Sequence, residues 1–182
     1  MESKGELRKR FKALRDGCPA GLRAAWSERI CTHLAAFCAE RGIKRVGSFG
    51  RFGSEVDLGA LAGTSLALCF PRVAGLEPPR LTWGPAPLAP GTWGLLEPVS
   101  APHALPPVEL LLVPGLAFAA DGHRLGYGKG FYDAVLAALP EAVITLAVGF
   151  ERQRCDRLPA DPRDRPVRGL VSEAGLTWFR AL

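Results

Sequence analysis

Apolar residues recur at helical spacing over one long stretch of the chain, residues 22–41. Residues three and four positions apart share a helix face, so this pattern predicts an amphipathic helix packed on a core. Pro19 before the stretch and Gly42 after it are typical of helix boundaries. The predicted apolar face comprises Leu22, Trp26, Ile30, Leu34, Phe37 and Cys38.

Short strand-like segments alternate with helix-like ones along the rest of the chain. Residues 110–113 form an apolar run stopped by Pro114 and Gly115, which favours a buried strand, although periodicity alone is also compatible with a short helix. A helix-like segment follows at 131–139. Alternating strands and helices predict a three-layer α/β fold, with a mostly parallel central sheet and helices on both faces. Other strands are expected at residues 45–49, 65–70, 80–83, 142–149 and 167–171.

We expect one domain over residues 1–182, because a chain of this length can bury most of its unfolded surface. Residues 84–107 are rich in proline and predict a surface loop within that domain, since the next strand is needed to complete the same sheet. No apolar run approaches the ~20 residues that span a bilayer. The first residues are polar and basic, without the apolar core of a signal peptide. We therefore expect a cytoplasmic monomer without a membrane partner.

The cysteines give no sign of a disulfide framework or a zinc site. Their number, five, is odd, and none belongs to a C-x-x-C pair. Cys31 and Cys38 lie seven positions apart on one helix face, which favours a place in the core. The three histidines are scattered and suggest no metal cluster.

The net charge of +5 suits an anionic ligand, and it would also suit RNA. Basic residues are concentrated between Lys4 and Arg15, in a stretch compatible with a helix. Such a run is usually a solvated helix face. Lys4 and Arg8, however, are four positions apart and project together. We expect the surface to hold Arg10, Lys12 and Arg15.

A glycine-rich loop follows the strand at 110–113. Gly126, Gly128 and Gly130 alternate with Tyr127 and Lys129, so backbone N–H groups can approach an anion closely. The helix that begins after them offers its N-terminus to the same anion. Spacing alone fits an ordinary flexible loop equally well, and the loop has neither Walker nor dinucleotide-fold glycine order.

Charged residues flank this loop. Arg124 and Lys129 supply cations, and Asp133 in the following helix is a carboxylate of the kind that holds Mg²⁺ beside phosphate. The plainer interpretation of Asp133 is a first-turn acid stabilised by the helix dipole.

The sequence from 113 to 133 closely resembles the signature of the 5-formyltetrahydrofolate cyclo-ligase family, also called methenyltetrahydrofolate synthetases. Residues 113–118 read VPGLAF, Gly122 follows, and residues 124–133 read RLGYGKGFYD. The resemblance implies the same α/β fold and an ATP- and Mg²⁺-dependent cyclisation of 5-formyltetrahydrofolate to 5,10-methenyltetrahydrofolate, with release of ADP and phosphate. The γ-phosphoryl group would pass to the formyl oxygen, and N10 would then attack the activated carbon. Positioning and charge neutralisation would be the main work of the protein.

The resemblance also implies roles for individual residues. Catalytic roles fall to Arg124, Lys129 and Tyr132. ATP contacts would come from Lys4, Arg8, Arg124, Leu125, Gly126, Tyr127, Gly128, Lys129, Gly130, Phe131 and Tyr132. Folate contacts would come from Phe49, Gly50, Glu55, Trp93, Tyr127, Gly128, Lys129, Gly130 and Phe131. Glu55 would accept two N–H groups of the pterin, and Trp93 would stack on a folate ring. Metal ligands would be Asp133 and Asp164.

The chain departs from the family pattern at several positions. Ala119 replaces a usual aspartate, and Asp121 lies two positions late as a candidate substitute. Arg163 stands where histidine is expected, and Phe131 replaces the first of two tyrosines. The changes at 119 and 163 bear on metal geometry and rate.

Two alternatives remain open. One is a different ATP-dependent transferase on the same scaffold. The other is a non-catalytic, basic RNA-associated module, which predicts steeply salt-dependent RNA binding but lacks any recognised RNA motif. The expected partner is therefore a small molecule, 5-formyltetrahydrofolate, possibly polyglutamylated, and we expect no nucleic acid partner.

Overall fold

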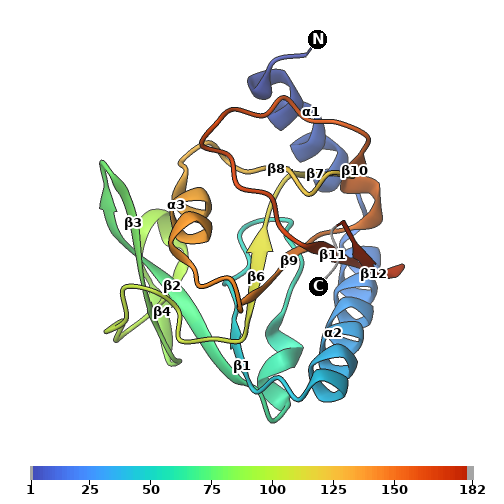
Figure 1. The fold of residues 1–182 in the computed structure, drawn as a ribbon. Coiled ribbons are helices and arrows are strands. Elements are labelled where there is room, and N and C mark those ends of the chain that lie inside the picture. The colour runs from blue at the N-terminus through green and yellow to red at the C-terminus, as the bar shows by residue number, and fades with distance from the viewer. Residues whose placement is uncertain (1, 180–182) are drawn as a thin grey trace.

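A seven-stranded sheet forms the centre of the computed structural model, which describes residues 2–179 (Figure 1). The strands lie in the order β12-β11-β9-β6-β1-β2-β3. All neighbours are parallel except the two edge pairs, β11 with β12 and β2 with β3. The strand bounds are Arg45–Gly47 (β1), Ala67–Leu76 (β2), Pro79–Gly84 (β3), Leu110–Pro114 (β6), Ile144–Val148 (β9), Gly169–Ser172 (β11) and Gly175–Trp178 (β12).

Helices cover both faces of this sheet, as the sequence predicts. Strand β6 shows why, because its side chains alternate between two apolar clusters. Leu110 and Leu112 pack with α2 (Ala20–Arg41), whereas Leu111 and Val113 pack on the side of α3 (Phe131–Ala138). All four are fully buried, which is typical of a central parallel strand. The prediction of a mostly parallel α/β sheet is confirmed.

Helix α1 (Lys4–Asp16) lies across the end of the sheet, beside a small sheet of β10, β7 and β8 (Figure 1). Its Leu7 and Phe11 pack on Leu116 and Leu125. A capping box between Ser3 and Glu6 fixes where the helix begins. This packing holds the basic face of α1 over the carboxyl ends of the parallel strands. The small sheet comprises β7 (Ala117–Ala119), β8 (Arg124–Leu125) and β10 (Arg154–Cys155).

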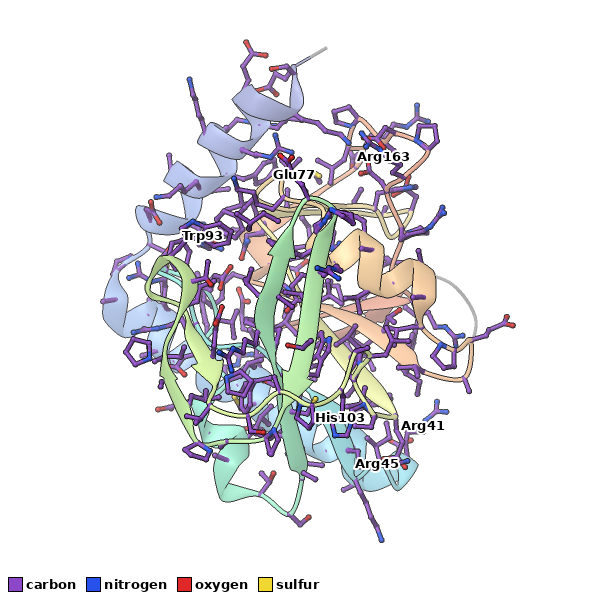
Figure 2. All side chains as sticks on the ribbon, turned by 90° about the vertical axis from the view of Figure 1, so that its left-hand side faces the viewer. Arg41, Arg45, Glu77, Trp93, His103 and Arg163 are labelled. Carbon is purple, nitrogen blue, oxygen red and sulfur yellow. The ribbon has the colours of Figure 1, made fainter. Side chains whose placement is uncertain are left out.

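The antiparallel β2–β3 hairpin extends along the side of the molecule. In Figure 2 its turn at Glu77 lies at the same end as Trp93 and Arg163, and Arg41 and Arg45 lie at the opposite end. Residues 84–107, expected to be a surface loop, contain a separate two-stranded sheet. The remaining elements are β4 (Leu88–Pro90), β5 (Leu96–Pro98) and the short 3₁₀ helices Gly59–Gly63, Thr92–Gly94 and Glu151–Gln153.

Several boundaries differ from the predicted ones. Helix α2 begins at Ala20, and Leu22 is 43% exposed because the buried face of this helix starts only at Ser27. Strand β2 continues past Phe70 to Leu76, through residues that resemble a turn. Strand β1 is shorter than expected and ends at Gly47.

The edge strand β12 has no counterpart among the predicted elements. It is a short antiparallel strand of four residues, all partly exposed. Its sequence, GLTW, contains no continuous apolar run that would predict a strand. Cys31 and Cys38 are buried, as predicted. Within residues 2–179, no helix is both long enough and apolar enough to cross a bilayer.

Candidate active site

One pocket of about 960 Å³ lies at the carboxyl ends of β1 and β6. This is where open α/β sheets bind their ligands, and the volume is at the upper end of the range for small-molecule sites. The pocket brings together every site residue that the sequence predicts. Those residues are Lys4, Arg8, Phe49, Gly50, Glu55, Trp93, Arg124, Leu125, Gly126, Tyr127, Gly128, Lys129, Gly130, Phe131, Tyr132, Asp133 and Asp164.

The glycine-rich loop packs directly on α1. The Nε of Arg8 donates to the carbonyl of Gly126 at 2.9 Å. Gly128 has a φ of 91°, and a Cβ at this position would lie 3.1 Å from the guanidinium carbon of Arg8. Glycine therefore permits both the backbone conformation and the close approach.

Gly130 is the N-cap of α3 and provides no side chain to cap it. The first N–H groups of this helix consequently face the pocket without a hydrogen bond from their own cap residue. This arrangement suits an anionic ligand, provided that the nearby cations also take part.

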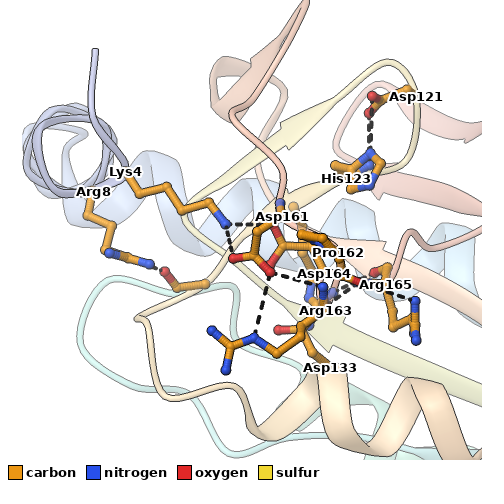
Figure 3. Close-up of polar contacts among 12 residues, drawn as sticks. Lys4, Arg8, Asp121, His123, Asp133, Asp161, Pro162, Arg163, Asp164 and Arg165 are labelled. Atoms are coloured by element: carbon orange, nitrogen blue, oxygen red, sulfur yellow. Dashed lines mark hydrogen bonds and ion pairs between the residues drawn. The ribbon is translucent and has the colours of Figure 1, made fainter. Parts of the chain in front are cut away.

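Each of two predicted phosphate-binding cations is paired with a predicted metal-binding carboxylate. The Nη2 of Arg124 lies 3.2 Å from Oδ1 of Asp133. The Nζ of Lys4 lies 2.6 Å from Oδ2 of Asp164 (Figure 3). Lys4 also contacts Asp161 at 3.0 Å. The pocket thus holds opposite charges that neutralise one another in the absence of ligand.

These pairs affect the two cations differently. Burial lowers the pKa of Arg124, whose side chain is only 4% exposed, and Asp133 acts in the opposite direction. Burial also acts to lower the pKa of Lys4, but hydrogen bonds to Asp164 and Asp161 outweigh it, so this pKa lies above its usual value. The raised pKa keeps Lys4 cationic at neutral pH, and an arginine side chain such as Arg124 is not deprotonated in proteins.

The carboxylates suit Mg²⁺ in number and kind. No group of three or more His, Cys, Asp or Glu side chains converges on a possible metal site within the described part of the chain. Asp133 and Asp164 nevertheless line the same pocket. Two carboxylates are enough for Mg²⁺, which usually takes waters and phosphate oxygens as its other ligands.

Asp121 does not take the place of the aspartate that Ala119 replaces. It pairs with His123, 3.1 Å from Nδ1, and both lie apart from the charged cluster in Figure 3. Asp121 does not line the pocket, whereas Arg163 does. The Arg163 side chain is 94% exposed, with Nε 3.9 Å from Asp161.

Glu55 lines the same pocket, together with Phe49 and Gly50. It is buried, and its two oxygens accept hydrogen bonds from the backbone N–H of Phe52 at 3.0 Å and the hydroxyl of Tyr127 at 2.9 Å. Burial raises the pKa of Glu55, and the nearby cation of Arg15 and these hydrogen bonds act to lower it.

Trp93 forms part of the pocket wall. Its ring centroid lies 6.3 Å from that of Phe131 and 5.6 Å from Nζ of Lys129. Its φ of 56° is unusual for a residue other than glycine. Half-exposed and next to a cation, the indole offers a flat surface on which a ring can stack.

Tyr132 borders the pocket, but its hydroxyl is buried. Within residues 2–179 this hydroxyl has no hydrogen-bond partner, and its ring packs edge-on against Trp83 at 6.5 Å. Burial raises the pKa of Tyr132 far above its usual value. A role in proton transfer is therefore disfavoured, whereas donation of a hydrogen bond to a ligand stays a prediction.

Three further charged residues at this site do not follow from the sequence signals. Arg15 was expected on the surface, and this is wrong, because its side chain is only 2% exposed. Leu7, Phe11 and Arg15 follow one another at intervals of four positions, which would have placed Arg15 on the buried face of α1. Arg15 does not line the pocket itself, whereas Glu97 and Asp161 do.

The fold and the pocket define an α/β enzyme with one large small-molecule site, lined by a glycine-rich loop and several cations. The chain belongs to the 5-formyltetrahydrofolate cyclo-ligase family, whose model matches residues 1–173.

Individual relatives agree with this assignment. The chain is 31% identical over 177 residues to a 5-formyltetrahydrofolate cyclo-ligase of Mycolicibacterium smegmatis, covering 88% of each protein. The NMR structure of the Aquifex aeolicus 5,10-methenyltetrahydrofolate synthetase superimposes with a TM-score of 0.83 at 33% identity, covering 98% of this chain and 94% of that one. A Mycoplasma pneumoniae synthetase shares the fold, with a TM-score of 0.78 at 21% identity, covering 94% of this chain and 99% of that one.

Proposed function

We propose that this protein cyclises 5-formyltetrahydrofolate to 5,10-methenyltetrahydrofolate and converts ATP to ADP and phosphate in the process, with the formyl oxygen leaving in the phosphate. The observation that carries the proposal is the continuity of the pocket. Cations, a glycine-rich loop and the buried carboxylate of Glu55 line one cavity. A nucleotide and a folate can therefore meet within one cavity.

The chemistry requires little covalent work from the protein. The formyl oxygen is a poor leaving group until it receives the γ-phosphoryl group of ATP. N10 then attacks the formyl carbon, the C–O bond breaks, and phosphate departs. Lys129, Arg124 and Arg8 neutralise charge on the transferred group, and the glycine-rich loop aligns it.

Asp133 and Asp164 would hold Mg²⁺, which when bound offsets negative charge on the phosphate oxygens. For this to happen, Arg124 and Lys4 must turn from these carboxylates toward the nucleotide. In such an exchange each carboxylate replaces its side-chain cation with the metal, and each cation replaces its carboxylate with phosphate. Metal and nucleotide are therefore expected to bind together.

Glu55 anchors the folate in this proposal, because an ionised carboxylate can accept two N–H groups from one edge of a reduced pterin. Phe49 and Gly50 line the same pocket, and Trp93 stacks on a ring of the substrate. We further propose a single-domain, cytoplasmic monomer without nucleic acid or membrane partners. The buried free thiols suit a reducing compartment.

A direct assay tests the proposed reaction. Purified protein, 5-formyltetrahydrofolate, ATP and Mg²⁺ are expected to give the methenyl chromophore together with one ADP per product. Omitting ATP is expected to abolish the signal. ADP release without the chromophore would contradict the proposal.

Arg163 and Ala119 favour one second candidate, a different ATP-dependent transferase, because both depart from the family pattern and Arg163 lines the pocket. A screen of carboxylate and formamide substrates for ADP release would detect that activity. None of these substrates is expected to give faster ADP release than 5-formyltetrahydrofolate does.

A further inference from the structure

A buried arginine, Arg15, contacts Tyr127 and Glu55, which both line the pocket, although Arg15 does not line the pocket itself. Arg15 lies in the last turn of α1, and its side chain is 2% exposed. Its Nε donates to Oγ of Ser54 at 2.9 Å, and its Nη2 donates to the hydroxyl of Tyr127 at 2.7 Å. Its Nη1 lies 3.9 Å from Oε1 of Glu55. The three nitrogens thus contact three different side chains.

The hydroxyl of Tyr127 lies between two of these charged groups. It accepts from Arg15 and donates to Glu55 at 2.9 Å. A guanidinium can only donate, so the direction of both hydrogen bonds is fixed. Tyr127 belongs to the glycine-rich loop, whereas Glu55 follows β1. Arg15 therefore holds the expected folate anchor and the nucleotide loop in one network.

A purely structural role would not require these partners. A buried cation needs only a counter-charge and hydrogen bonds, and Asp16 is close by, bonded to Ser54. Arg15 instead also contacts Tyr127 and Glu55, which both line the pocket.

We propose that Arg15 is a positioning residue for folate binding, which keeps Glu55 ionised and fixes the direction of its oxygens through Tyr127. This inference rests on the proposed function. Arginine is required because lysine offers a single point charge and cannot reach three groups from separate nitrogens.

The surroundings of Glu55 explain why a counter-charge is needed. Burial raises the pKa of Glu55, and Arg15 is the main opposing influence. The other titratable groups that face it are Tyr127 from the glycine-rich loop and Tyr132 from α3, and both are neutral phenols at neutral pH. Without Arg15 the pKa would rise further, so Glu55 would take up a proton at a higher pH. Binding that needs the ionised form would then be lost earlier as the pH falls.

The test measures the dissociation constant for 5-formyltetrahydrofolate from mildly acidic to mildly alkaline pH by calorimetry. Arg15→Met is expected to weaken binding about tenfold or more at acidic pH, since one unit of pKa corresponds to about a factor of ten. The loss should shrink as the pH rises. Arg15→Lys keeps the charge and should restore most of the pH profile but not the full affinity. Arg10→Met replaces an exposed arginine of the same helix and should match the wild type.

Tyr127→Phe provides a second measurement should Arg15→Met fail to fold. It removes the hydroxyl between the two charges, and weaker, more pH-dependent folate binding is expected. The inference would be overturned if Arg15→Met lost folate affinity by the same factor at every pH. It would also be overturned if Arg15→Lys and Tyr127→Phe both bound the folate as the wild type does. Failure of the wild type to bind folate would instead count against the proposed function.

Discussion

Replacing Glu55 with glutamine is expected to raise the KM for 5-formyltetrahydrofolate about ten- to a hundredfold, because hydrogen bonds to a charged group contribute roughly 1.5–3 kcal/mol. The amide of glutamine has one acceptor oxygen, and its NH₂ group opposes a pterin N–H. The KM for ATP should change little, since Glu55 is proposed to contact the folate and not the nucleotide. Steady-state kinetics with each substrate varied in turn measures both constants.

Glutamine is preferred to alanine for this test because it keeps the shape of the side chain, and its one acceptor oxygen can still accept from the backbone N–H of Phe52. Alanine would leave the buried Arg15 without its neighbour, at a cost in stability. Glu28→Gln, on the exposed side of α2, is the matched control and should behave as the wild type. An equal rise in both KM values would refute the assignment of Glu55.

Replacing Lys129 with alanine is expected to change the KM for ATP more than the KM for the folate, the reverse of the Glu55 variant. Lys129 is exposed in the pocket and takes part in no ion pair within residues 2–179, so its loss breaks no internal charge pair. The KM for ATP should rise about ten- to a hundredfold, because a cation contributes roughly 1.5–3 kcal/mol to an anionic ligand. The KM for the folate should change much less. Thermal unfolding of the variant should match the wild type.

Lys9→Ala is the control for this variant, since Lys9 is an exposed lysine of α1 that does not line the pocket. The assignment of Lys129 fails if the alanine variant loses folate affinity while its use of ATP stays normal. Together the Glu55 and Lys129 variants distinguish the residue that binds the folate from the residue that binds ATP.

Local sequence signals predict the elements that carry the site. The run at 110–113 is apolar because β6 is covered on both faces, and the glycines mark the loop because the backbone there packs on Arg8. The helix at 131–138 follows from its own residues. These features depend on short-range patterns, so they can be read before the fold is known.

Long-range partners decide the features that sequence patterns miss. Arg15 looks like one more surface cation until Tyr127, 112 positions away, comes to lie beside it. The pair of Lys4 and Asp164 joins residues 160 positions apart. Strand β2 extends past Phe70 because β3 pairs with it, although Pro71 and Gly75 locally favour a turn. Such outcomes depend on tertiary contacts rather than on local preference.

The most direct test of the whole account is calorimetry of nucleotide binding to the intact wild-type chain. Because Lys4 and Arg124 are paired with Asp164 and Asp133, ATP and Mg²⁺ together are expected to bind at least about tenfold more tightly than ATP alone, within the usual range of coupling between two sites. Mg²⁺ alone should give little heat. Absence of any binding of ATP with Mg²⁺, with or without 5-formyltetrahydrofolate, would contradict the central claim that this loop and these cations hold a nucleotide.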